Sequence, residues 1–204
     1  MGDWRISIEP IVLEGDAVRL EPLSTEHLAG LAEVGLAGDV FRWFTQPVTT
    51  RSEMQAFIQT ALGEQQAGTA LPFAAFSRRL ERIVGSTRFA NIDPNNRRVE
   101  IGWTWLAPAH QRTVVNTEAK YLMLRHAFES WGCNRVEFKT DSLNERSRKA
   151  LLRIGAKEEG TLRNHMVTAS GRLRHSVYFS IVSEDWPAVK AMLLGKLEIA
   201  RPAA

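Results

Sequence analysis

The sequence is poor in the residues that usually build redox or metal centres. Cys133 is the only cysteine among 204 residues, which excludes an intramolecular disulfide and any site made of several cysteines. The five histidines are scattered and lack the spacing of metal ligands, so we expect no metal site. The pattern GxxxxGK[ST] is missing, which disfavours a nucleotide triphosphatase, and the absence of GxGxxG disfavours a dinucleotide-binding fold.

Long apolar runs and a strong charge imbalance are also missing. No segment reaches membrane length and no signal peptide is recognisable, so we expect a cytoplasmic protein without a membrane partner. A hydrophobic content of 44% is ordinary for a globular chain. The net charge of +3 suits a phosphate-rich ligand but is too small to indicate nucleic acid.

The most informative stretch that is present begins at Glu100. Residues 100–106 alternate in character and predict a strand that Pro108 ends. The predicted faces are Ile101, Trp103 and Trp105 on one side and Glu100, Gly102 and Thr104 on the other. An apolar stripe over 119–131 then predicts a buried helix. The loop between them is either an ordinary connection or a phosphate site at a helix N-terminus, to which Arg112 adds a full charge.

The surrounding pattern predicts a mixed, mostly antiparallel sheet flanked by helices. Strands are expected at 18–21, 71–77 and 83–91, and short turns connect the last two to the strand at Glu100, which indicates an antiparallel meander. A further strand at 135–140 follows the buried helix and predicts a parallel crossover.

The C-terminal part predicts a hairpin, with long strands at 156–168 and 172–182. We expect one domain over 13–198, preceded by an arm at 1–12 and followed by a tail at 199–204.

The central stretch resembles the acyl-CoA-binding core of the GNAT acetyltransferases, in the branch like the ribosomal-protein alanine N-acetyltransferases RimJ and RimL. In that family a strand ending near Trp103-Thr104-Trp105-Leu106 leads into a loop of the form Gln-Arg-Thr-Gly-x-Asn-Thr and a helix. Here Gln111-Arg112-Thr113 and Asn116-Thr117-Glu118-Ala119-Lys120 match, and Val114 stands in place of the Gly. The likeness covers nearly the whole chain.

This resemblance implies a GNAT-like α/β fold with an acyl-CoA cleft. It implies an enzyme that moves an acetyl group from acetyl-CoA to a primary amine, in a small molecule or at a peptide N-terminus, without a covalent enzyme intermediate. The oligomeric state stays open, with a homodimer as one alternative. The residues that would hold the donor are Trp105, Leu106, Gln111, Arg112, Thr113, Val114, Val115, Asn116, Thr117 and Asn144.

The residue at position 114 supports an alternative function. Gly permits the positive φ that brings a loop backbone close to a pyrophosphate, whereas the β-branched Val114 resists it. The alternative is therefore a catalytically weak GNAT-like module that binds acyl-CoA or contacts another protein.

Glu100 is the candidate general base, acting directly or through a water on the attacking amine. It is predicted on the strand face opposite the tryptophans. The alternative is a solvated strand charge paired with Arg97 or Arg98.

Asn144 and Ser147 lie three residues apart and share a face at the start of a helix. The same pattern is also a plain signature of a helix N-terminus. The resemblance places an Asn near the pantetheine and a hydroxyl near the CoA sulfur. Many relatives use a Tyr there to give the departing thiolate its proton, and Ser147 is the candidate for that catalytic role here.

Four residues are candidates for contacting the acceptor: Trp43, Trp103, His165 and His175. Trp43 is either core filler or a wall of the acceptor pocket, which the resemblance places under this region. His165 and His175 are expected to face each other across the hairpin, as a polar rim or as a packing pair.

Overall fold

An eight-stranded sheet organises the computed structural model, which describes residues 6–200. The strand order is β1-β2-β3-β4-β5-β6-β8-β7, and all neighbours are antiparallel except β5 and β6, which are parallel. The predicted meander and crossover are therefore confirmed. The strands are β1 (Leu13–Glu14), β2 (Val18–Pro22), β3 (Leu71–Ser77), β4 (Arg82–Asp93), β5 (Arg98–Leu106), β6 (Arg135–Asp141), β7 (Lys157–Val167) and β8 (Leu173–Val182).

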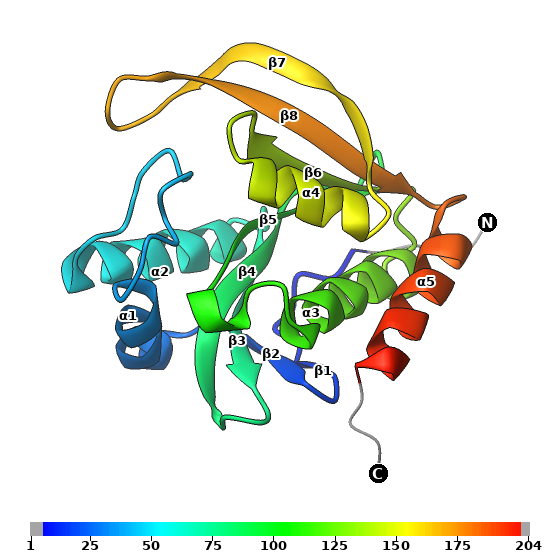
Figure 1. The fold of residues 1–204 in the computed structure, drawn as a ribbon, viewed down its shortest axis with the longest axis horizontal. Helices are drawn as coiled ribbons and strands as arrows, with labels where there is room; N and C mark the ends of the chain where they lie inside the picture. Colours follow the sequence, from blue (N-terminus) through cyan, green and yellow to red (C-terminus); the bar gives the residue numbers. More distant parts are fainter. Residues whose placement is uncertain (1–5, 201–204) are drawn as a thin grey trace.

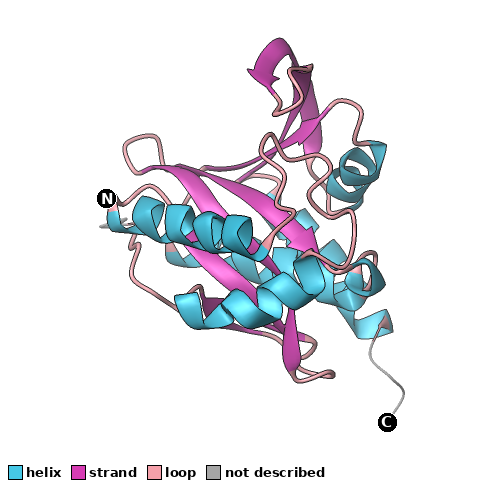
Figure 2. Ribbon diagram, turned by 90° about the vertical axis from the view of Figure 1, so that its left-hand side faces the viewer, coloured by secondary structure: helices cyan, strands magenta, loops and turns pink. Residues whose placement is uncertain are grey.

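Helices cover both faces of this sheet (Figure 1). In Figure 2, α1 and α2 lie in front of the strands, and the other helices lie behind or beside them. The helices are α1 (Leu28–Gly35), α2 (Arg51–Gln66), α3 (Val114–Arg125), α4 (Glu145–Arg153) and α5 (Trp186–Ile199), with short 3-10 turns at Thr25–His27 and Pro108–His110 and a π-helical turn at His126–Ser130. No helix between residues 6 and 200 has the length and hydropathy needed to cross a bilayer.

Two hydrophobic cores, one on each face of the sheet, hold these layers together. The main core packs α3, α4 and α5 against the sheet, and the second core packs α1 and α2 against the other face. Of the predicted arm, Ile6 and Ile8 pack against the main core, whereas residues 1–5 lie outside the described part. Of the predicted tail at 199–204, Ile199 is instead the last residue of α5, and residues 201–204 lie outside the described part.

The sequence predicts a helix start at Thr50, because Thr50 and Glu53 have the spacing of a capping box, and the structure confirms it at the start of α2. The Thr50 hydroxyl accepts a hydrogen bond from the Glu53 N–H at 3.1 Å, and the Glu53 carboxylate accepts from the Thr50 N–H at 3.0 Å. This reciprocal capping box satisfies N–H groups that have no partner inside the helix. The rest of the architecture serves to position one cavity between β5 and β6.

Candidate active site

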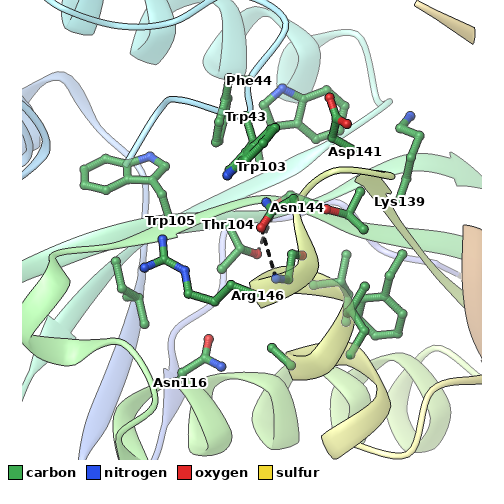
Figure 3. A pocket seen from close by; sticks show the side chains of 18 of the residues that line it. Trp43, Phe44, Trp103, Thr104, Trp105, Asn116, Lys139, Asp141, Asn144 and Arg146 are labelled. Carbon is green, nitrogen blue, oxygen red and sulfur yellow. Dashed lines mark hydrogen bonds between the residues drawn. The ribbon is translucent and has the colours of Figure 1, made fainter. Parts of the chain in front are cut away.

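A cavity of about 700 Å³ lies where β5 and β6 separate (Figure 3). The two parallel strands are paired only at Arg98–Glu100 with Arg135–Glu137. Beyond that point β5 continues along β4 while β6 continues along β8. The opening crosses the sheet, so residues from both faces line it. We call the part on the face covered by α3 and α4 the α3 side, and the part on the face covered by α1 and α2 the α2 side.

A bulge in β5 shapes the opening. Trp103 has a φ of 47°, and the pairing with β4 shifts between Arg88–Gly102 and Ser86–Trp105. Because an extra residue reverses the alternation of side chains, Ile101 packs in the main core while Trp105 packs in the second core. The prediction that Ile101, Trp103 and Trp105 share one face is therefore wrong.

The bulge also corrects the predicted position of Glu100. Lys139 lies 3.4 Å from the Glu100 carboxylate, and its ammonium is 5.9 Å from the centre of the Trp103 ring. Glu100 and Trp103 therefore lie on the same face, the α2 side, and not on opposite faces as predicted.

On the α3 side, the loop before α3 has the form expected of an anion site. Gln111, Arg112 and Asn116 line the cavity, and the Gln111 amide donates to the Leu106 carbonyl at 2.8 Å. The Thr113 hydroxyl donates to the His110 carbonyl at 2.8 Å and does not cap the helix. The first N–H groups of α3 thus have no side-chain acceptor among the described residues, which suits a ligand phosphate.

Val114 fits this loop without strain. It is the first residue of α3, and the positive φ of the loop, 63°, belongs to Arg112. The expectation that Val114 resists the required backbone conformation is wrong, and the weak-module alternative loses its basis. Val115 is buried in the main core, so any contact with a ligand there comes from its backbone.

The α4 helix forms the opposite wall of the α3 side. The Asn144 side chain accepts from the Ser147 N–H at 3.1 Å, as drawn in Figure 3, so Asn144 is a helix cap as well as a cavity residue. Ser147 is half-buried and lines the cavity. Arg146 extends from α4 into the cavity in Figure 3. Neither Arg146 nor Arg153, which also lines it, has a carboxylate within 4.0 Å among residues 6–200.

Lys120 is the most unusual group on the α3 side. It is buried at 6% exposure, lines the cavity, and donates from Nζ to the Thr104 hydroxyl at 2.7 Å. No carboxylate of the described chain pairs with it. Burial lowers the pKa of the Lys120 ammonium to about 7, because a desolvated cation is unfavourable.

The α2 side contains the candidate base. Glu100 is 3% exposed and accepts from the Asn91 amide at 2.7 Å, in addition to its ion pair with Lys139. The alternative of a solvated charge paired with Arg97 or Arg98 is wrong, since Arg98 pairs instead with Asp93 and Glu137. Glu100 lines the cavity and is held in one orientation.

Aromatic side chains surround Glu100 on this side. Trp43, Phe44 and Trp103 line the cavity, as Figure 3 shows. The Arg88 guanidinium lies 4.9 Å from the Trp103 ring and forms an ion pair with Glu64 at 2.6 Å. Trp43 is only half-buried, which favours the predicted pocket wall over core filler.

The β7–β8 hairpin arches over the segment between α1 and α2 (Figure 1). Two hydrogen bonds join them: Arg174 donates to the Trp43 carbonyl at 3.3 Å, and the Ala169 N–H donates to the Thr45 carbonyl at 2.9 Å. The buried carboxylate of Asp141 orients Arg174 and also accepts from Arg172 at 2.5 Å. This bridge encloses the α2 side of the cavity.

The two hairpin histidines do not face each other. His175 is exposed and accepts through Nδ1 from the Asn164 N–H at 2.9 Å. The His165 ring instead contacts Tyr178, with 5.8 Å between ring centres. A shift in the β7–β8 pairing between Leu162 and Met166 separates the two rings, and neither histidine lines the cavity.

Several cavity residues were missed by the sequence analysis: Lys120, Lys139, Asp141 and Arg174. A local signal existed for one of them, because Asn116 and Lys120 are separated by one helical turn and share a face. By contrast, Lys139 and Glu100 form a pair although they are 39 positions apart in the sequence, and no local pattern predicts such a pair. Cys133 is buried, which raises the pKa of its thiol to about 12 and disfavours the nucleophilic thiolate.

Comparison with known proteins agrees with this geometry. The model of the "Acetyltransferase (GNAT) domain" family matches residues 17–157. The Bacillus subtilis protein YdaF, named as a candidate ribosomal N-acetyltransferase, is 32% identical over 108 residues, which are 53% of this chain and 58% of that protein.

Solved structures show the same fold. A GCN5-related N-acetyltransferase from Brucella melitensis is 32% identical with a TM-score of 0.86, covering 93% of this chain and 86% of that one. Mycobacterium smegmatis RimJ, solved with CoA-disulfide, is 23% identical with a TM-score of 0.75, covering 88% of each chain. The chain belongs to the GNAT family of acetyl-CoA-dependent N-acetyltransferases.

Proposed function

We propose that this enzyme acetylates a free amino group held on the α2 side of the cavity, using acetyl-CoA held on the α3 side. The observation that carries the proposal is the cavity itself, which crosses the sheet at the gap between β5 and β6. A donor on one face and an acceptor on the other can meet there and nowhere else along the two strands. Bringing both reactants to one point supplies much of the rate enhancement of a transfer reaction.

The residues of the α3 side fit an anionic donor. Arg112, Arg146 and Arg153 carry charges without carboxylate partners among the described residues, and α3 presents N–H groups without a cap. The pyrophosphate would lie at residues 112–117, and the pantetheine arm would follow β5 toward the bulge at Trp103. Such a site combines full charges with backbone donors, as anion sites at helix N-termini do.

Glu100 would accept the proton of the attacking amine, directly or through a water. Its carboxylate is fixed by Asn91 and Lys139, so it needs no reorganisation during the reaction. Ser147, across the α3 side from Thr104, would donate a hydrogen bond to the donor sulfur. No covalent bond to the protein is needed.

The acceptor is a small amine or the free end of a peptide. The bridge from Arg174 and Ala169 to the segment between α1 and α2 encloses the α2 side, which favours a narrow group over a side chain within a folded surface. The name of YdaF points to a ribosomal acceptor, and a ribosomal-protein N-terminus is one candidate of this class. A cytoplasmic location is consistent with that acceptor. A homodimer remains a separate prediction, which light scattering can test.

An acceptor panel tests the proposal. Acetyl-CoA consumption should be measured with peptides that have free N-termini, with the same peptides blocked at the N-terminus, with small primary amines, and with a folded lysine-rich protein. We expect turnover with at least one free-ended or small amine and none with the folded protein. CoA should also raise the melting temperature by mass action. Turnover confined to internal lysines, or no stabilisation at millimolar CoA, would contradict the proposal.

A further inference from the structure

A buried lysine on the donor face has no role in the scheme above. Lys120 is enclosed between α3 and β5, and among the described residues its ammonium makes one hydrogen bond, to the Thr104 hydroxyl. An ammonium has three N–H donors, so two of them lack an acceptor among the described residues. A buried cation in this condition is costly, and an apolar residue would serve packing better. Because Lys120 lines the cavity, its free donors can be satisfied by a ligand.

Lys120 lies on the donor face of the sheet, close to the bulge in β5. Thr104 follows Trp103, the residue of positive φ at the bulge, and its hydroxyl contacts the Thr87 hydroxyl at 2.7 Å on the α3 side. Glu100 lies on the other side of the sheet, against Lys139. The two ionisable groups thus approach the gap from opposite faces, one from the donor face and one from the acceptor face.

We propose that Lys120 is the proton donor to the sulfur of CoA as it departs. This inference rests on the placement of the donor proposed above. As the amine nitrogen bonds to the carbonyl carbon, the C–S bond breaks and its electron pair goes to sulfur. Lys120 gives a proton from Nζ to that sulfur, and Glu100 takes a proton from the amine nitrogen. Solvent then reprotonates Lys120 and removes the proton from Glu100, so charge and protons balance.

The acidity of Lys120 suits this role. Burial brings the pKa of its ammonium to about 7, below the value near 8.5 typical of a free thiol, so the transfer to a thiolate is downhill. Ser147 can donate a hydrogen bond to the sulfur, but a serine hydroxyl does not release its proton near neutral pH. Lys120 on the donor face can therefore supply a proton to the sulfur, whereas Ser147 on α4 can supply only a hydrogen bond.

Two substitutions separate a proton donor from a plain positive charge. Lys120→Met keeps the length of the side chain and removes both charge and proton. Lys120→Arg keeps the charge, but guanidinium does not give up a proton in proteins. We expect both variants to lose roughly 10²-fold in kcat. The Kd for CoA, measured by calorimetry, should change far less. Lys190→Met, on α5 and paired with Glu129, is the matched control and should keep full activity.

Stability separates this role from a structural one. We expect Lys120→Met to melt no lower than the native protein, because a buried unpaired cation is replaced by an apolar group. A lysine that merely supports the fold would show activity and melting temperature falling together, and that result would overturn the proposal. If the Arg variant alone melts low, the Met variant decides through its kcat and Kd.

Three other results would also overturn it. Full activity in Lys120→Arg would show that charge alone is needed. A kcat within twofold of native in Lys120→Met would show that the proton comes from elsewhere. An acetyl group found on Lys120 by mass spectrometry after turnover would show a nucleophile instead. Failure of the native protein to bind CoA or to turn over would overturn the proposed function, and is distinguishable from all of these.

Discussion

The two sides of the cavity differ in whether their charged side chains are paired. On the α2 side each buried charge already has a partner, as in the pairs of Glu100 with Lys139, Asp141 with Arg172, and Arg88 with Glu64. On the α3 side the cations of Arg112 and Lys120 have no carboxylate partner in the described chain.

The difference shows which reactant completes which part of the site. The exposed, unpaired charge of Arg112 is stabilised by an anionic ligand, so binding on the α3 side should depend on salt concentration. Paired charges hold the α2 side in shape before any acceptor arrives, so substitutions there should affect rate or stability more than donor binding. The following predictions test this division, from the largest expected effect to the smallest.

Glu100→Gln should lower kcat/KM for amine acetylation by roughly 10²-fold or more, because the amide cannot accept the proton of the amine. The Kd for CoA should stay within about twofold, since Glu100 lies on the α2 side. Steady-state kinetics and calorimetry measure the two quantities. An unchanged rate would make Glu100 a structural partner of Lys139 only.

Asp141→Asn should lower the free energy of unfolding by about 2 kcal/mol, because it leaves the buried Arg174 guanidinium without its carboxylate. Chemical denaturation measures this loss. Asp39→Asn is the control: its pair with Arg42, at 3.7 Å, is exposed and should contribute less than about 1 kcal/mol. Equal losses in the two variants would refute the claim that the α2 side depends on internal pairing.

Arg112→Gly should separate binding from stability. Removing the charge should weaken CoA binding about tenfold, or about 1.4 kcal/mol. The same change relieves a left-handed backbone at φ 63° and should stabilise the fold by about 1 kcal/mol. Arg148→Ala, which removes a residue paired with Glu158 away from the cavity, should leave the Kd for CoA unchanged. A tighter complex in Arg112→Gly would contradict the assignment of this charge to the donor.

Val114→Gly should have the smallest effect. Val114 is already helical, so Gly offers no conformational advantage, and KM for acetyl-CoA should stay within about twofold. A tenfold tighter complex would show that the family Gly matters here through close approach rather than through φ.

The sequence predicted the large elements well because their signals are local. The capping box at Thr50 and Glu53, the crossover from β5 to β6 and the terminal hairpin all follow from short patterns. The bulge at Trp103 could not be foreseen, because a positive φ at a tryptophan is imposed by pairing with β4 and not by its own preference.

The site was only partly predictable for the same reason. Gln111, Arg112, Asn116 and Ser147 were found through motifs and line the cavity. The separation of His165 from His175 depends on a pairing shift in the hairpin that no residue type signals.

The bridge over the α2 side has a consequence for how the acceptor preference can change. Arg174 and Ala169 bind the carbonyl oxygens of Trp43 and Thr45, and not their side chains. Every residue type has a backbone carbonyl, so a substitution that keeps the backbone path also keeps these hydrogen bonds. Positions 43 and 45 can therefore exchange bulk, polarity or charge while the hairpin stays attached. A library randomised at these two positions should yield folded enzymes with new amine preferences.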